Sequence, residues 1–424
     1  MSLPKLRALV FASLILSAGC QRQADSPADA PAGMAVAAGD GLVLVSWAQD
    51  PDPNLTCWIF YQAGGSVTPA APGVSIIRTA QSPRVIANLA NGQQYAFVMN
   101  ATNRDSPAGP STPVMTATPQ FAGANWTAGT PLGNTPQNLN GIAFNGSRFV
   151  LVGDAGAIFA GDYNYASTNL NPPGPPGVTA WTPVVSVWWA SQLTGVVPNL
   201  SAVIFNGAQF VALSADGSIL TSTDGFTWAF TGTVPAAGAS MNGIALGSVS
   251  GAAVYVVVGT GGAMFTSPDL VNWTPRASNP VNASDLFGVA FLNGGFVATG
   301  ANGTLLTSPD GSNWTGQDSG TTSALRSAAF GVSVAAGSRY VAVGDGTIVT
   351  SADALTWTPI SAPNLRGVTF GSRFVAIGQG GAVAYSDDGI NWFTSTTGLD
   401  LNRVIFAPGM YVAVGAAGVN AVSK

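Results

Sequence analysis

Recurring acidic turns contain the residues whose types and spacing could do chemistry in this chain. The sequence SDDGINW at 386–392 sets two adjacent carboxylates beside a glycine and a tryptophan, and paired carboxylates serve many hydrolases as general acid and base. Close relatives recur at intervals of roughly 40 residues, a period typical of repeated structural units; they are STDGFTW at 222, SPDLVNW at 267, SPDGSNW at 308 and SADALTW at 351. Because Ser and Asp readily hydrogen-bond nearby amides, we interpret the central aspartates as turn formers: Asp224, Asp269, Asp310, Asp353 and Asp388.

The composition argues against an enzyme. All 19 acidic residues are aspartate, and the chain has no glutamate and no histidine, so it lacks the commonest general bases and the commonest neutral metal ligand. A glycan-acting hydrolase or lyase that uses aspartates alone remains the alternative, with Asp154, Asp216 or Asp345 as its candidate acids. The aspartate turns lack the closing acid of a calcium loop. We therefore expect neither a metal ion nor a cofactor.

The acidic turns belong to a longer repeat within residues 120–424. Each copy has an opening strand, a second strand that ends in a glycine turn, a third strand that leads into the aspartate turn, and a fourth strand begun by tryptophan. Seven opening strands and seven glycine turns can be aligned, and four short strands at this period predict the blades of a β-propeller. The last copy lacks a fourth strand, whereas Trp126 stands ahead of the first copy. We expect residues 124–130 to complete the last blade and to close a seven-bladed ring.

The turns resemble the Asp-box of sialidase-like, or BNR-repeat, propellers. The whole repeat, about 300 residues long, is still more similar to the photosystem II assembly-factor-like group. A sialidase of this family would need an arginine triad, an acid, and a tyrosine activated by a glutamate, and the chain has no glutamate. The resemblance therefore implies a shape and not a chemistry.

One mouth of such a propeller offers a candidate binding site, because the opening strands line the central channel and their first residues face this mouth. The first positions are Asn140, Ser201, Asn242, Phe287, Arg326, Arg366 and Asn402, and Arg403 follows one place later. Arginines on one arc favour recognition of an anion or carboxylate, which the guanidinium fork matches in shape. The alternative is that each arginine pairs with a turn aspartate, such as Asp345 or Asp154. We expect the asparagines and arginines of this set to contact the ligand.

Adjacent tryptophans supply a second candidate surface. Trp188 and Trp189 lie in SVWWASQLTG at 186–195, between the first and second copies of the repeat. Such aromatics bind sugar faces or form protein hot spots, or they pack as a local core. The sequence leaves both interpretations open.

The beginning of the chain predicts export. Residues 1–19 combine a short basic region, an apolar run and small residues before Cys20, which is the pattern of a secretory signal. It resembles a bacterial lipoprotein signal, which implies that Cys20 is lipidated; an ordinary signal peptide is the alternative. By the same resemblance, Gln21 favours the outer membrane, facing the periplasm or the outside. Residues 20–33 are small and polar and predict a flexible tether.

Residues 34–119 predict a small all-β sandwich, because short alternating strands are separated by turn signals. Trp47, the sequence LANGQQYAFVMNATN at 89–103 and the closing ATP at 117–119 resemble a fibronectin type III domain. That family implies a spacer or a protein-binding module.

Charge completes the prediction. If Lys5 and Arg7 leave with the signal, 12 of the 14 basic residues remain against 19 acidic residues, which argues against nucleic acid as a partner. We expect an all-β chain, a fibronectin type III sandwich followed by a seven-bladed β-propeller. We expect it to be a non-enzymatic, lipid-anchored envelope protein whose propeller mouth holds a protein or carbohydrate, as an assembly or adhesion factor. A passive surface spacer is the third interpretation.

Overall fold

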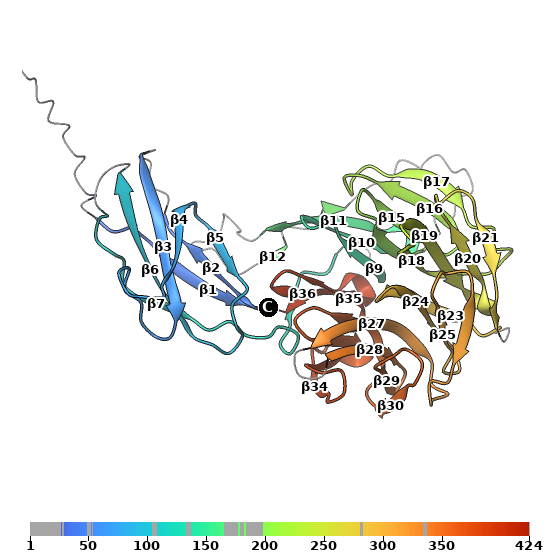
Figure 1. Ribbon diagram of the computed structural model, residues 1–424. Helices are drawn as coiled ribbons and strands as arrows, with labels where there is room; N and C mark the ends of the chain where they lie inside the picture. The colour runs from blue at the N-terminus through green and yellow to red at the C-terminus, as the bar shows by residue number, and fades with distance from the viewer. Residues whose placement is uncertain are drawn as a thin grey trace, which may run out of the picture.

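The protein is all-β in the part of the chain that its structure, a computed structural model, describes. This part comprises residues 27, 29–48, 52, 54–103, 108–132, 137–164, 177–178, 182–183, 198–279, 283–333 and 337–423. The predicted signal peptide, Cys20, Trp188 and Trp189 lie outside it. Within it no helix has the length and apolarity needed to cross a membrane. Two bodies lie side by side, a smaller N-terminal one and a larger one of sheets arranged around a centre (Figure 1).

The smaller body consists of two antiparallel sheets. The first has the order β1 (Ala35–Gly39), β2 (Leu42–Ser46), β5 (Arg84–Ala87). The second has the order β4 (Ser75–Ala80), β3 (Leu55–Ala63), β6 (Tyr95–Asn103), β7 (Met115–Ala117). Both sheets contribute to one core, in which Val43, Trp47, Ile59 and Phe97 are buried. Cys57 is half-buried in β3.

The larger body is a β-propeller of four-stranded sheets, some with a short fifth strand. The first three sheets in chain order are β9 (Leu139–Phe144), β10 (Arg148–Gly153), β11 (Ile158–Asn164), with β12 (Gly177–Val178) and β13 (Thr182–Pro183) on β11; β14 (Leu200–Phe205), β15 (Phe210–Ser214), β16 (Ser218–Ser222), β17 (Ala229–Thr233); and β18 (Met241–Val249), β19 (Ala252–Gly259), β20 (Met264–Ser267), β21 (Thr274–Arg276). The next two are β23 (Leu286–Leu292), β24 (Gly295–Gly300), β25 (Leu305–Ser308), β26 (Trp314–Gln317), with β22 (Ser278–Asn279) on β26; and β27 (Leu325–Ser333), β28 (Gly337–Gly344), β29 (Thr347–Ser351), β30 (Thr358–Ser361). The last two are β31 (Leu365–Phe370), β32 (Phe374–Gly378), β33 (Ala382–Ser386), β34 (Phe393–Thr396); and β35 (Leu401–Ala407), β36 (Met410–Gly415), β37 (Asn420–Ser423), with β8 (Thr127–Ala128). The first strand of each sheet contacts the first strand of the next, and β35 returns to β9.

Four glycine turns contain one turn of 3₁₀ helix. They are η1 (Asp154–Gly156), η2 (Thr260–Gly262), η3 (Gln379–Gly381) and η4 (Ala416–Gly418). Each follows the second strand of its sheet and leads into the third. The turns therefore lie beside the beginnings of the opening strands, where the candidate mouth was predicted.

The sheets are apolar on both faces because each is packed between two others. An aromatic residue near the start of the second strand is buried in successive sheets and contacts the phenylalanine that ends the opening strand. Phe149 lies 4.3 Å from Phe144 between ring centroids, and Tyr411 lies 4.9 Å from Phe406. Trp228, which follows an aspartate turn, packs with residues of β10 and β15 in one intersheet core. Aromatic residues thus pack both within a sheet and between neighbouring sheets.

The N-terminal strand β8 pairs with the last strand, β37, through Ala128 with Ala421 and Thr127 with Val422. The Gly123 amide donates to Ser423 Oγ at 2.7 Å, and Trp126 packs against the same apolar cluster. Chain segments about 300 residues apart are joined at this sheet.

Asp40 connects the two bodies. It is 5% exposed, and its carboxylate accepts hydrogen bonds from Asn91 Nδ2 at 2.7 Å, from the Ala122 amide at 3.2 Å and from Ser372 Oγ. Its own amide donates to the carbonyl of Gly409 at 3.5 Å. One buried carboxylate therefore contacts the smaller body, the linker and the propeller.

Candidate ligand-binding mouth

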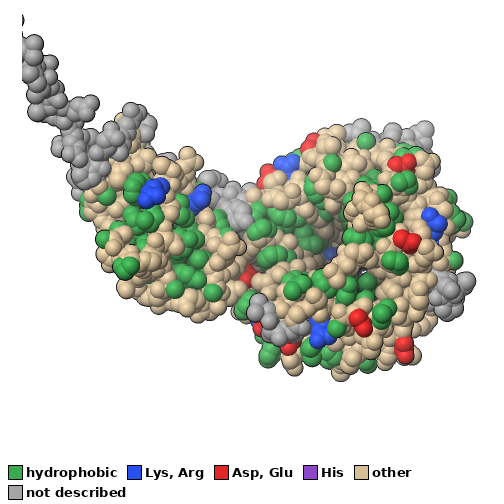
Figure 2. Space-filling model, in the orientation of Figure 1, with side chains coloured by type: hydrophobic (Ala, Val, Ile, Leu, Met, Phe, Trp, Pro, Cys, Tyr) green, Lys and Arg blue, Asp and Glu red, His purple; other side chains and the backbone are tan. Residues whose placement is uncertain are grey.

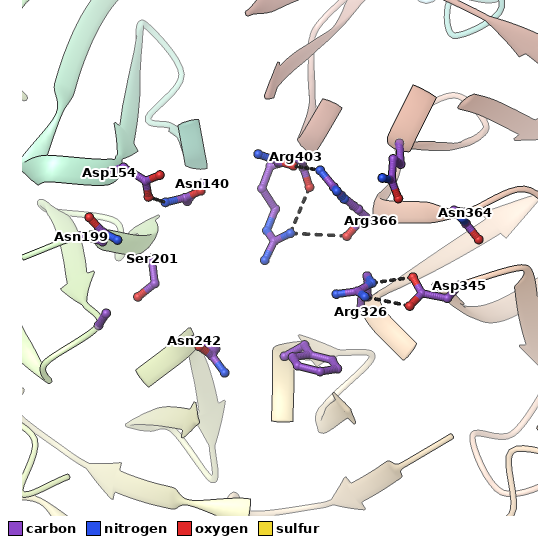
Figure 3. Close-up of a pocket in the computed structure, with 14 residues that line it drawn as sticks. Asn140, Asp154, Asn199, Ser201, Asn242, Arg326, Asp345, Asn364, Arg366 and Arg403 are labelled. Carbon is purple, nitrogen blue, oxygen red and sulfur yellow. Dashed lines mark hydrogen bonds and ion pairs between the residues drawn. The ribbon is translucent and has the colours of Figure 1, made fainter. Parts of the chain in front are cut away.

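A polar cavity of about 530 Å³ opens where the opening strands begin. Figure 2 shows the hollow at the centre of the larger body, and Figure 3 shows the residues that surround the cavity. Its lining includes all the asparagines and arginines predicted to contact a ligand, namely Asn140, Asn242, Arg326, Arg366, Asn402 and Arg403. The register of the repeat thus brings together residues that lie up to 263 positions apart in the chain.

The small polar residues of the mouth tie neighbouring opening strands together. Asn140 Nδ2 donates to the Leu200 carbonyl at 3.1 Å, and Asn242 Nδ2 donates to the Leu286 carbonyl at 2.8 Å. Asn402 Nδ2 closes the ring by donating to the Leu139 carbonyl at 3.0 Å. Ser201 does the same through its hydroxyl, which donates to the Met241 carbonyl at 2.7 Å. These side chains therefore have a structural role, whatever else they bind.

Arg326 is paired, as the alternative interpretation predicted. Its Nε and Nη2 donate to the two carboxylate oxygens of Asp345, each at 2.7 Å, and its guanidinium lies 5.1 Å from the ring centroid of Phe287. The hydrogen bonds to Asp345 raise the pKa of Arg326, and those from Arg326 lower the pKa of Asp345. Both members of this bidentate pair line the cavity, and both are partly exposed.

Arg366 and Arg403 are different. Among the described residues there are three ion pairs, and neither arginine takes part in one. Arg366 Nη1 donates to Asn402 Oδ1 at 2.7 Å, while Arg403 Nη1 donates to the carbonyls of Asn402 at 2.9 Å and Arg366 at 3.4 Å. Burial lowers the pKa of Arg403, and the charges of Arg326 and Arg366 lower it further. The mouth therefore holds two guanidinium groups that form no ion pair with a carboxylate of the described residues, although the charge of Arg366 helps to lower the pKa of Asp345.

The candidate acids of the enzyme alternative are each held by hydrogen bonds to other residues of the chain. Asp154 accepts hydrogen bonds from Asn140 Nδ2 and Asn138 Nδ2, each at 2.8 Å. Asp216 accepts the Ser218 amide at 2.9 Å and lies outside the lining of this cavity. The lowered pKa of Asp345 is opposite to the raised pKa that a general acid needs. No group of three His, Cys, Asp or Glu side chains that could bind a metal is found in the described part of the chain.

The five aspartate turns share one geometry. In SDDGINW, Asp388 Oδ1 accepts the amides of Ile390 and Asn391, both at 2.8 Å, and Ser386 Oγ accepts the Gly389 amide at 2.8 Å. The other four aspartates accept the same pair of amides, two and three residues further along: Asp224, Asp269, Asp310 and Asp353. All five lie outside the lining of the mouth.

Three further amides line the mouth and were not predicted. Asn199 and Asn364 each precede the leucine that begins an opening strand, and Gln379 begins a glycine turn. A signal was present in the sequence, because Asn-Leu followed by a polar residue recurs at 138, 199 and 364.

The larger body is similar to known propellers. A model of the DUF6242 β-propeller domain family matches residues 268–404. Two similar solved structures are YCF48 bound to D1 peptide, with 19% identity, a TM-score of 0.51 and coverage of 70% of this chain and 96% of that one, and virginiamycin B lyase from Staphylococcus aureus, with 9% identity, a TM-score of 0.54 and coverage of 71% and 99%. YCF48 from Cyanidioschyzon merolae matches with 19% identity, a TM-score of 0.50 and coverage of 70% and 98%. No curated protein sequence matches the chain. At these identities the similarity shows the fold alone: this chain contains a β-propeller domain.

Proposed function

We propose that this protein is a non-enzymatic binding or assembly factor of the cell envelope, and that its propeller mouth holds a carboxylate-bearing protein partner. The observation that carries the proposal is the pair Arg366 and Arg403, which form no ion pair in a cavity that is also lined by six amide side chains. The two carboxylates of the lining are held by other partners, Asp345 by Arg326 and Asp154 by Asn138 and Asn140. Guanidinium groups bind carboxylates with strong, directed hydrogen bonds. Amide side chains match the donors and acceptors of a peptide backbone.

The proposed architecture follows the sequence. Lipidation at Cys20 anchors the chain to the outer membrane, residues 20–33 form a tether, a fibronectin type III domain acts as spacer, and a seven-bladed propeller presents the mouth. The solved structure of YCF48 with a D1 peptide supports a protein partner, because it has a propeller of similar shape and holds a peptide.

An enzymatic role has less support. A similar solved structure is that of a virginiamycin B lyase made catalytically inactive by replacement of a histidine, whereas this chain contains no histidine. A glycan partner is the second candidate, because the asparagine and serine side chains of the mouth also suit sugar hydroxyl groups.

Crosslinking in the native cells, followed by affinity purification and mass spectrometry, tests the proposal. Three proteins are compared: the parent, a mouth variant Arg366→Ala/Arg403→Ala, and a charge-matched control Arg78→Ala/Arg84→Ala on exposed positions of the smaller body. We expect one dominant protein with the parent and the control, and its loss with the folded mouth variant. Equal capture by all three proteins would show that the partner binds outside the mouth. If no protein is captured at all, the protein proposal fails, and a glycan array tests the second candidate.

A further inference from the structure

Arg403 breaks a regular feature of the opening strands. The residue that follows the mouth position is small in the other strands: Gly141, Ala202, Gly243, Gly288, Ser327 and Gly367. Neighbouring opening strands approach closely there, since a Cβ added at Gly288 would lie 2.7 Å from the Arg326 carbonyl oxygen. Only β35 places a long side chain at this level, and that side chain is charged.

The side chain of Arg403 extends from β35 towards the centre of the ring (Figure 3). Arg403 lines the mouth cavity and also a narrower cavity of about 160 Å³, which is bordered by the small residues of the opening strands. Arg326 lines both cavities as well, and Arg366 lines the mouth cavity alone. Arg403 therefore stands where the mouth narrows, which we call its floor.

The floor is rich in unused hydrogen-bond donors. A guanidinium has five N–H donors, yet the hydrogen bonds found for Arg403 and Arg366 in the described part of the chain all start from one nitrogen of each, Nη1. Both arginines are half-buried, and two cations confined in one cavity repel each other unless an anion accompanies them. The lowered pKa of Arg403 has the same physical origin. Arg326, by contrast, has its carboxylate in Asp345.

We propose that Arg403 and Arg366 form an oxyanion site at the floor of the mouth, which receives one anionic group end-on along the channel axis. The inference deepens the proposed function and rests on it for the identity of the partner. The shared chemistry is that of a carboxylate, sulfate or phosphate oxygen that accepts hydrogen bonds from both guanidinium groups. In a protein partner the group is an acidic side chain or a chain terminus. Arg326 also borders the narrower cavity, but its charge is already neutralised by Asp345.

Sulfate and acetate, titrated separately at constant ionic strength, serve as probes. Binding is followed by NMR of the arginine Nε–Hε signals in the parent, in Arg403→Gly, which has the glycine found in several sister strands, and in Arg403→Lys. The control Arg326→Gln/Asp345→Asn removes the ion pair between these two residues without changing the net charge. We expect saturable shifts of the Arg366 and Arg403 signals in the parent. We expect a loss of affinity of about tenfold or more in Arg403→Gly, a partial loss in Arg403→Lys, and a change within about twofold in the control.

The inference is overturned if the parent shows no saturable shift, or if folded Arg403→Gly binds sulfate like the parent. A larger loss of affinity in Arg326→Gln/Asp345→Asn than in Arg403→Gly would show that the anion binds at Arg326. These outcomes are separate from those of the crosslinking test. If a protein partner is captured but sulfate does not bind, only the inferred anion site at the floor of the mouth fails. If sulfate binds but no protein is captured, the proposed protein partner fails and the anion site stands.

Discussion

The aspartate turns show how a single carboxylate replaces missing backbone partners. Asp388 accepts two amides in its own turn and also lies 3.0 Å from Ser386 Oγ. The next residue, Gly389, has φ +72° and no room for a Cβ, which would lie 2.9 Å from Arg339 Cγ. The residue types of SxDG therefore follow from the geometry of the turn, and catalysis is not needed to explain them.

Loss of one turn carboxylate should destabilise the propeller modestly. We expect Asp388→Ala to lower the free energy of unfolding by about 1 kcal/mol, because two amides lose their acceptor. Asp388→Asn should lose less, since the amide oxygen can still accept both hydrogen bonds. Urea unfolding at neutral pH measures the difference, and equal stability of parent and Asp388→Ala would contradict the structural role.

The same turns predict acid sensitivity. The pKa of Asp224 is lowered from 3.8 to about 2, chiefly by the Thr227 amide. For Asp310 and Asp388 burial raises the pKa, but the amides of Asn313 and Asn391 and further hydrogen bonds outweigh it, and the result is again about 2. A carboxyl whose pKa is lower in the folded chain stabilises it above the unfolded pKa, and this stabilisation is lost as the pH falls through the folded pKa. The free energy of unfolding should therefore fall between about pH 4 and pH 2, and less steeply in Asp388→Asn. If the free energy of unfolding stays constant over this pH range, the lowered pKa values of the turn aspartates do not contribute to stability.

At the scale of elements, a buried tyrosine joins two sheets of the propeller. Tyr411 in β36 is fully buried, and its hydroxyl donates to the Arg373 carbonyl at 2.8 Å and accepts the Arg373 amide at 3.2 Å. Burial raises the pKa of Tyr411 to about 12, so the hydroxyl stays protonated and able to donate. Arg373 stands at the turn before β32, in the neighbouring sheet.

Tyr411→Phe tests this connection between sheets. The variant leaves the buried Arg373 amide without its acceptor, whereas the Arg373 carbonyl keeps the Gly371 amide at 3.0 Å. We expect a loss of about 1–3 kcal/mol in the free energy of unfolding. Tyr385→Phe is the matched control, because Tyr385 lies in β33 and stacks on Phe393 without a hydroxyl hydrogen bond among those found. A smaller loss in Tyr411→Phe than in the control would contradict the account.

Strands and turns could be predicted from the sequence because their signals are local. Alternation, glycine turns and the repeated SxDGxxW motif indicated propeller sheets, and the aligned register placed the arginines at one mouth. The pairing of Arg326 with Asp345, and not of Arg366 with any carboxylate, depends on the reach of side chains across neighbouring strands. The hydrogen bonds of Asn140, Asn242 and Asn402 to neighbouring strands likewise follow only from three-dimensional spacing.

At the scale of the whole molecule, Asp40 fixes the smaller body against the propeller. We expect Asp40→Ala to cost about 1–3 kcal/mol in the free energy of unfolding and to speed hydrogen exchange at the Ala122 amide, which loses its acceptor. Asp29→Ala, at an exposed position of the smaller body, is the control. Unchanged exchange at Ala122 would show that the two bodies are held together by other contacts.

Charge is distributed unevenly over the molecule. The chain has a formal net charge of −5, yet three of its arginines line the mouth of the propeller. Two aspartates, Asp154 and Asp345, line the same mouth, so its arginines exceed its carboxylates by one. This local excess of positive charge attracts an anionic group, while the acidic rest of the surface repels acidic partners.

The most direct test is the dissociation constant of the captured partner for the purified parent, the mouth variant Arg366→Ala/Arg403→Ala and the control Arg78→Ala/Arg84→Ala. Binding through the mouth predicts a weakening of about tenfold or more in the folded mouth variant and a change within about twofold in the control. Equal affinity of the parent and the folded mouth variant would contradict the central claim that the propeller mouth holds the partner.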